Sequence, residues 1–102
     1  MQPKIAVIGV LRFPPENIVE ILPHLQVLLD TTRLNDGCIA YDVAEDPFDP
    51  GLIRFSELWP DRDSLTKHLA APHVEQWRAM AKKNGLINRQ FTSYNIEGIQ
   101  PV

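Results

Sequence analysis

The chain opens with one continuous apolar run, which is followed by a stripe of apolar residues at helical spacing. Residues 4–13, KIAVIGVLRF, are rich in β-branched side chains and predict a strand. Pro14 and Pro15 end that strand, and a proline suits the first turn of a helix. Between residues 16 and 34, apolar side chains recur on one helix face: Ile18, Ile21, Leu22, Leu25, Leu28 and Leu29. Pro23 lies inside this stripe, so we expect it to kink or split the helix.

The middle of the chain predicts a β-hairpin. The Asn-Asp-Gly sequence at 35–37 is a typical helix end and turn. Residues 38–45 and 52–59 are rich in β-branched and aromatic side chains, which favour strands. The segment DPFDPG between them holds two X-Pro steps and a glycine, as a loop does.

A broken helical region and a last strand follow the hairpin. Asp61 is a plausible N-cap for a short helix over residues 62–71. Pro72 opens a second helix, which Gly85 ends as a C-terminal glycine. Residues 86–96, LINRQFTSYNI, predict the fourth strand.

The order β-α-β-β-α-β, with the second helical stretch broken at Pro72, indicates a ferredoxin-like α+β sandwich. We expect one domain over residues 1–102, with the helices covering one face of an antiparallel four-stranded sheet.

The first strand is apolar on both of its faces. Ile5, Val7 and Leu11 alternate with Ala6, Ile8 and Val10. Because the helices can cover only one face, we expect a homodimer packed through the sheet face, as a dimeric α/β barrel. The alternative is a monomer that leaves a small apolar patch exposed.

Composition and charge exclude several classes of partner. The 102 residues are 44% hydrophobic and 23% charged, with a net charge of −3 and no run of Lys or Arg. We therefore expect neither nucleic acid nor an anionic membrane surface as a partner, and no apolar run is long enough to cross a bilayer. A single cysteine, Cys38, excludes an internal disulfide, and a reducing, cytoplasmic location fits best.

Two of the three histidines, His68 and His73, flank Pro72. Their spacing differs from the i, i+4 pair of helical zinc sites, and only His24 could add a nitrogen, so we expect no metal. His68 should lie in the last turn of one helix and His73 in the first turn of the next. A helix C-terminus favours imidazolium, so we expect His68 to be the more readily protonated ring.

An acidic residue lies between two aromatic residues on one face of the hairpin. Phe55, Glu57 and Trp59 alternate along one strand, and we expect further aromatic residues to share their interior: Tyr41, Trp77, Phe91 and Tyr94. For most of these aromatic residues, ordinary core packing is the better explanation. A carboxylate there needs a partner, for which the candidates are Arg33, Arg54, Lys67 and His68. No nucleophile elbow and no glycine-rich phosphate loop is present.

Two segments resemble the antibiotic biosynthesis monooxygenase family, which includes small quinol monooxygenases. They are TRLNDGCIAYDV at 32–43 and FSELWPDRDSLTKHLAAPHV at 55–74. Within them the family pattern is matched by Arg33, Gly37, Cys38, Tyr41, Glu57, Trp59, His68 and His73. The likeness runs from Ile5 to about Ile96.

The resemblance implies a ferredoxin-like dimer whose pocket oxidises an aromatic or quinol-like molecule with oxygen, without metal, flavin or other cofactor. It makes His68 the candidate base or hydrogen-bond partner. The candidate substrate contacts are Trp59, Phe55, Glu57, Arg33, His73, Tyr41 and Trp77. Val7 to Val10 and Trp77-Arg78 stand where haem-degrading relatives carry other residues, which argues against haem degradation.

Two other functions stay open from the sequence. The same fold can form a dimeric module that binds a hydrophobic ligand without catalysis. A relative with similar motifs isomerises a small phosphorylated dione, which requires a cationic anchor that the sequence does not clearly supply.

Overall fold

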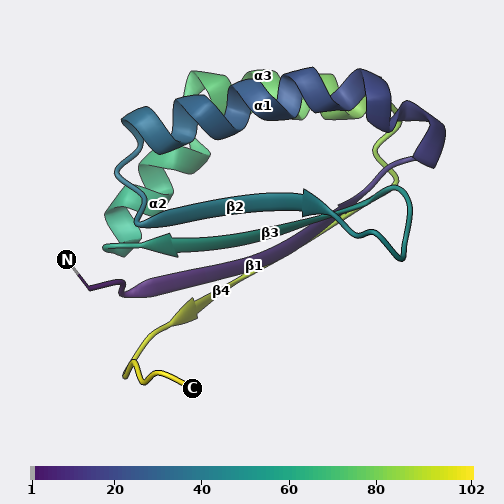
Figure 1. Ribbon diagram of the computed structural model, residues 1–102. Helices are drawn as coiled ribbons and strands as arrows, with labels where there is room; N and C mark the ends of the chain where they lie inside the picture. The colour runs from purple at the N-terminus through teal and green to yellow at the C-terminus, as the bar shows by residue number, and fades with distance from the viewer. Residues whose placement is uncertain (1) are drawn as a thin grey trace.

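The computed structural model describes residues 2–102, which form a four-stranded sheet with its helices on one side (Figure 1). The elements in chain order are β1 (Ile5–Arg12), the short 3-10 helix η1 (Pro15–Asn17), α1 (Ile18–Asn35), β2 (Ala40–Glu45), β3 (Leu52–Trp59), α2 (Arg62–Leu69), α3 (Pro72–Lys83) and β4 (Asn88–Asn95). The predicted ferredoxin-like α+β sandwich is confirmed, with the second helical stretch divided into α2 and α3.

The sheet order is β2-β3-β1-β4, and all neighbouring strands run antiparallel. β1 is therefore central, and its residue Gly9 pairs with Phe55 on one side and Phe91 on the other. β4 is an edge strand, so one side of the space beneath the helices is bounded by β4 alone.

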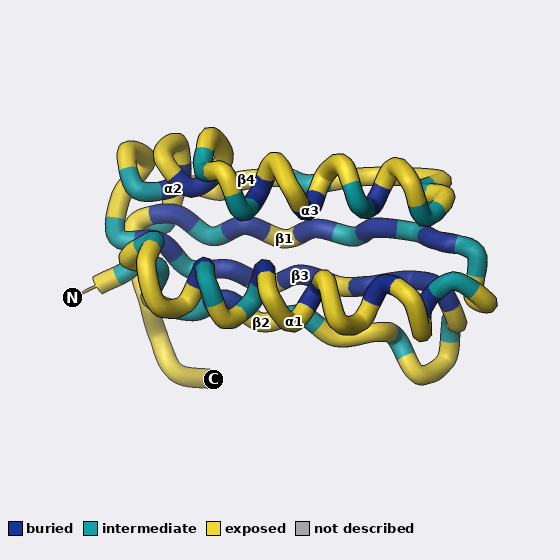
Figure 2. Tube along the Cα trace, turned by 90° about the horizontal axis from the view of Figure 1, so that it is seen from above, coloured by how far each residue is buried: buried dark blue, intermediate teal, exposed yellow. Residues whose placement is uncertain are grey.

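The core lies between the sheet and the helices, where the buried positions of β1 and β3 run beneath α1 and α3 (Figure 2). Ile5, Val7 and Leu11 are buried there, as the alternation along β1 predicts. Among residues 2–102, no helix covers the opposite face of the sheet, and Ile8 on that face is 53% exposed.

Pro23 does not split the first helix, because α1 runs without interruption from Ile18 to Asn35. Pro23 lacks the N–H that would bond the carbonyl of Val19. Both residues are on the exposed side of the helix, where water can satisfy that carbonyl. The expectation that the helix is divided is therefore wrong.

The break between α2 and α3 follows its predicted signals. Asp61 caps α2 by accepting a hydrogen bond from the Ser64 backbone N–H at 2.7 Å. Pro72 begins α3, and Gly85, with φ +84°, follows its C-terminus in the left-handed region. This break turns the chain between His68 and His73. Within residues 2–102, no helix has the length and apolarity needed to cross a membrane.

Candidate active site

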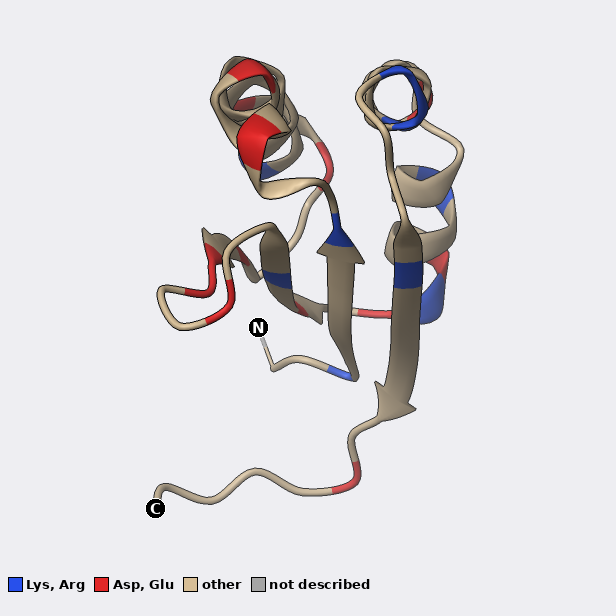
Figure 3. Cartoon of the chain, turned by 90° about the vertical axis from the view of Figure 1, so that its right-hand side faces the viewer, with Lys and Arg blue, Asp and Glu red and all other residues tan. Residues whose placement is uncertain are grey.

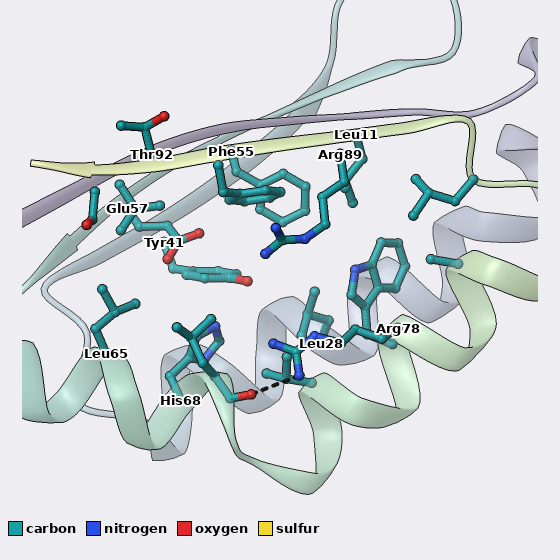
Figure 4. A pocket seen from close by; sticks show the side chains of 18 of the residues that line it. Leu11, Leu28, Tyr41, Phe55, Glu57, Leu65, His68, Arg78, Arg89 and Thr92 are labelled. Carbon is teal, nitrogen blue, oxygen red and sulfur yellow. Dashed lines mark hydrogen bonds between the residues drawn. The ribbon is translucent and has the colours of Figure 1, made fainter.

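A cavity of about 270 Å³ lies between the sheet and the α2–α3 segment, toward the β4 edge (Figure 4). Its inner wall is apolar and aromatic, with contributions from Val7, Leu28, Tyr41, Phe55, Leu65 and Trp77. His68 projects into it from α2, and Glu57 projects from β3. The volume suits a ligand of one or two rings.

His68 is held by a carboxylate that the sequence analysis did not single out. The His68 Nδ1 atom lies 2.6 Å from Asp36 Oδ2, and the His73 Nε2 atom lies 2.8 Å from the same oxygen. The side chains of Asp36 and His68 are 9% and 4% exposed. The helix break at Pro72 brings both imidazoles to the C-terminal end of α1, where Asp36 is the C-cap residue.

The contact with Asp36 determines the tautomer of His68. A carboxylate can only accept hydrogen bonds, so Nδ1 of a neutral His68 carries the proton and Nε2 carries the lone pair. Nε2 has no protein hydrogen-bond partner among residues 2–102 and is free to act on a bound molecule. His68 thus has the arrangement of a general base oriented by an acid.

Burial lowers the pKa of His68 below its ordinary value of 6.5, and the Asp36 carboxylate only partly opposes this effect. The expectation from helix polarity, that His68 is the more readily protonated of the two rings, stays a prediction, and burial of the ring opposes it. Its position at the end of α2 is as predicted, but the ring is enclosed by Tyr41 and Trp59, whose ring centroids lie 5.3 and 4.8 Å away. The cost of charging a desolvated ring outweighs the attraction of the helix end.

Asp36, His68 and His73 form the one group of three metal-ligating side chains found within residues 2–102, with ligand atoms within 4.8 Å of one another. The helix break at Pro72 brings His68 and His73 together, although their spacing along the chain differs from that of a helical zinc pair. Both ring nitrogens contact a single carboxylate oxygen at hydrogen-bond distances, however. An ion would need its own position about 2.0–2.2 Å from each ligand atom, so the observed geometry is that of a hydrogen-bonded trio.

The buried carboxyl of Glu57 is 4% exposed and accepts a hydrogen bond from Trp59 Nε1 at 2.9 Å. Its partner is therefore none of the four candidates, Arg33, Arg54, Lys67 and His68, that the sequence offered. Glu57 and Trp59 are two residues apart on the same face of β3, so their side chains are close enough to form this hydrogen bond. Burial raises the pKa of Glu57 to about 7.

The predicted aromatic residues divide between the cavity wall, the layer behind it and the open face. Tyr41, Phe55 and Trp77 line the cavity with Glu57 and His68. Trp59 is fully buried behind His68, and His73 lies behind Asp36. Phe91 joins the wall, but Tyr94 lies on the opposite face and is 53% exposed, because it pairs with Ala6 rather than with an inward residue.

Gly9 makes room for the wall formed by Phe91. A Cβ atom built on Gly9 would lie 2.2 Å from Phe91 Cδ2, much closer than atoms can approach. The Phe91 ring therefore lies across β1 and meets Phe55, with ring centroids 5.1 Å apart. No local pattern indicates this contact, because Gly9 and Phe91 are on strands far apart in the chain.

Arg33, a candidate substrate contact, is not among the cavity-lining residues. Its Nε atom donates to the Tyr41 carbonyl at 2.9 Å, and its guanidinium pairs with Asp42 at 3.2 Å on the surface. Three other arginines do line the cavity: Arg62, Arg78 and Arg89. These three arginines come together only through the packing of α2, α3 and β4, which no local pattern indicates. Asp36, by contrast, lies in the Asn-Asp-Gly turn of a segment that already resembled the family.

The comparisons with known proteins agree with this architecture. Residues 4–80 match the sequence model of the family described as antibiotic biosynthesis monooxygenase. An uncharacterized protein of Synechocystis is 27% identical over 73 residues, which are 72% of this chain. The chain spans about half the length of that relative.

Solved structures extend the likeness to nearly the whole chain. A protein of Deinococcus radiodurans, whose name is taken from the same family, aligns with a TM-score of 0.89 and 26% identity over 96% of this chain and 97% of its own. A second structure, named antibiotic biosynthesis monooxygenase, aligns with a TM-score of 0.84 and 30% identity over 92% and 99%. With the matched segment covering β1 to α3 and hence Asp36, Glu57, His68 and His73, the chain belongs to the antibiotic biosynthesis monooxygenase family.

Proposed function

We propose that the cavity is the active site of a cofactor-independent monooxygenase that oxidises a small phenol or quinol with molecular oxygen. The observation that carries the proposal is the His68 imidazole, held at Nδ1 by Asp36 and free at Nε2 beside the apolar wall of the cavity. The family supports an oxygenase, and the proposal adds the substrate class and the roles of the residues.

His68 supplies the first step by removing the phenol proton. A ring hydroxyl within about 3 Å of Nε2 would transfer its proton to that nitrogen. The imidazolium then forms against the Asp36 carboxylate, which stabilises the new charge. The apolar wall excludes water, so the phenolate stays electron-rich and unsolvated.

The remaining chemistry balances without an external reductant. The phenolate of a quinol passes one electron to oxygen, and the resulting radical pair joins at a ring carbon to form a hydroperoxide. Loss of water from the hydroperoxide leaves a hydroxyquinone. One quinol and one oxygen molecule thus give one hydroxyquinone and one water, and the quinol supplies all four electrons. A simple two-electron oxidation would instead give a quinone and hydrogen peroxide.

The proposal includes the homodimer through the sheet face. The face opposite the helices exposes Ile8 and Tyr94 at 53% each, and Leu58 on the same face of β3 is half-buried. A second copy would cover these side chains. Sedimentation at micromolar concentration tests the homodimer, with Ile8→Lys as the variant that should disrupt it. A monomer in both the wild type and the variant would contradict the homodimer.

Oxygen consumption with a panel of quinols tests the catalytic proposal. We expect His68→Gln to lower the rate by about 100-fold or more, the usual contribution of a general base. His24→Gln is the matched control, because His24 is an exposed histidine on α1 outside the cavity. Peroxide assays and product analysis separate the two oxidations.

Two results would count against it. Equal activity in wild type and His68→Gln would keep the oxygenase and remove His68 as its base. No oxygen uptake in either protein, together with binding of the same quinols, would favour the non-catalytic binding module.

A further inference from the structure

The six arginines of the chain divide into two sets of three. Each member of the first set pairs with an aspartate at 2.7 to 3.2 Å: Arg12, Arg33 and Arg54. The second set, Arg62, Arg78 and Arg89, lines the cavity. Within residues 2–102, no carboxylate oxygen lies within 4.0 Å of this second set.

The cavity arginines are positioned by neutral partners. Arg78 donates to the Leu69 carbonyl at 2.9 Å, and the Arg89 guanidinium lies 4.6 Å from the Phe91 ring centroid. Arg62 donates to Ser93 and Asn95 at 2.9 and 3.0 Å. These contacts hold the side chains in place but leave their positive charges uncompensated. Figure 4 shows Arg89 reaching into the cavity from β4 and Arg78 approaching from α3.

Basic residues are concentrated in the same part of the chain as the cavity arginines. Residues 62–95 carry six of the ten basic residues but only two of the thirteen acidic ones, although the net charge is −3. Figure 3 shows basic residues on α3 and β4, and acidic residues on α1 and in the β2–β3 loop. The cavity therefore opens into the positive side of a negative protein, where an anion is attracted.

Glu57 is the one carboxylate among the cavity-lining residues, and it does not occupy the arginines. It lies on β3 at the inner wall, bonded to Trp59, and makes no ion pair with the described arginines. The arginines stand at the β4 side of the same cavity. An aromatic wall on one side and unpaired guanidinium groups on the other suit a ring with an anionic substituent.

We propose that the cavity takes a one- or two-ring aromatic ligand bearing a carboxylate or phosphate, with that group held by Arg78 and Arg89. The site of the ring rests on the proposed function above, whereas the anionic substituent rests on the arginines alone. A guanidinium fork binds either oxyanion through paired hydrogen bonds. This selects acidic phenols or quinols over neutral ones as substrates.

Matched ligands test the inference by calorimetric titration under anaerobic conditions, where no oxidation occurs. The probes are hydroquinone, 2,5-dihydroxybenzoate and 4-hydroxyphenyl phosphate. We expect at least one anionic probe to bind about 10-fold or more tightly than hydroquinone, because it adds hydrogen bonds to charged guanidinium groups. The tighter of the two identifies the oxyanion, and its affinity should fall as salt rises.

Two variants locate the anion. Arg89→Gln and Arg78→Gln should each weaken the preferred anionic probe about 10-fold and change hydroquinone affinity less than two-fold. Lys82→Gln is the control, because it removes one positive charge from the exposed side of α3 without lining the cavity. Circular dichroism verifies that each variant is folded.

The result separates this inference from the proposed function. Preference for an anionic probe without oxygen uptake supports the arginine site and contradicts the monooxygenase. Oxygen uptake with equal affinity for neutral and anionic probes supports the monooxygenase and contradicts the arginine site. Equal affinity of all three probes, no binding at millimolar concentration, or a preference unaffected by both arginine variants would overturn the inference.

Discussion

The two ends of the cavity are built on opposite principles. The inner end is closed, with His68 and Glu57 each 4% exposed among aromatic rings. The outer end is formed by exposed arginines on α3 and β4 that have no carboxylate partners among the described residues. At the inner end burial shifts the pKa values of ionisable groups, and at the outer end water leaves the guanidinium groups fully charged. The same cavity thus combines a neutral base with permanent positive charge.

The largest effect on stability is expected at the inner end, from Glu57→Gln. The folded pKa of Glu57 is about 7, above its ordinary value of 4.5. Its contribution to stability is therefore fully present below pH 4.5 and is lost as pH rises through 7. Relative to wild type, Glu57→Gln should gain about 2 to 3 kcal/mol between pH 5 and pH 8. Urea unfolding at both pH values measures this difference, and a difference independent of pH contradicts the buried carboxyl.

The wall between the two ends is tested by Gly9→Ala. The added methyl would meet the Phe91 ring, so the ring must leave its place on β1. We expect a loss of about 2 kcal/mol in the free energy of unfolding, typical of overpacking. Gly98→Ala is the control, since nothing lies within 4 Å of its added Cβ atom. Equal stability of the two variants would show that Phe91 does not lie across β1.

A smaller effect, confined to catalysis, is expected from Asp36→Asn. Loss of the carboxylate removes a charged hydrogen bond from His68, so the oxygen-uptake rate should fall about 10-fold with little change in KM. Because Asp36 raises the pKa of His68, the acid limb of the pH–rate profile should move to lower pH in the variant. Asp42→Asn, an exposed carboxylate beside Arg33, should change neither property. A rate loss without movement of the acid limb would assign Asp36 a structural role only.

The smallest effect should come from the outer end. Arg89→Gln removes an exposed contact with Phe91, so the free energy of unfolding should change by less than about 1 kcal/mol. Thermal unfolding measures it. A loss of several kcal/mol would mean that this arginine supports the fold, and the contrast between the two ends would disappear.

This contrast also explains what the sequence could and could not predict. The strands, the helix break at Pro72 and the inward row of Phe55, Glu57 and Trp59 follow from local periodicity, and each is present. The Asp36 contact and the arginine set join segments that are distant in the chain, so no local pattern encodes them. Burial of the His68 ring, which opposes the protonation that helix polarity favours, is likewise a tertiary property that no local pattern encodes.

The proposed chemistry depends above all on the protonation state of His68, which can be measured without a substrate. Nitrogen-15 NMR of the imidazole, resolved from His24 and His73 by their substitution with glutamine, reports which nitrogen carries the proton. At pH 7 we expect Nδ1 to be protonated and Nε2 to be bare, with a midpoint below pH 6.5 on acid titration. A proton on Nε2 at pH 7, or a midpoint above 6.5, would contradict a neutral base held at the cavity wall.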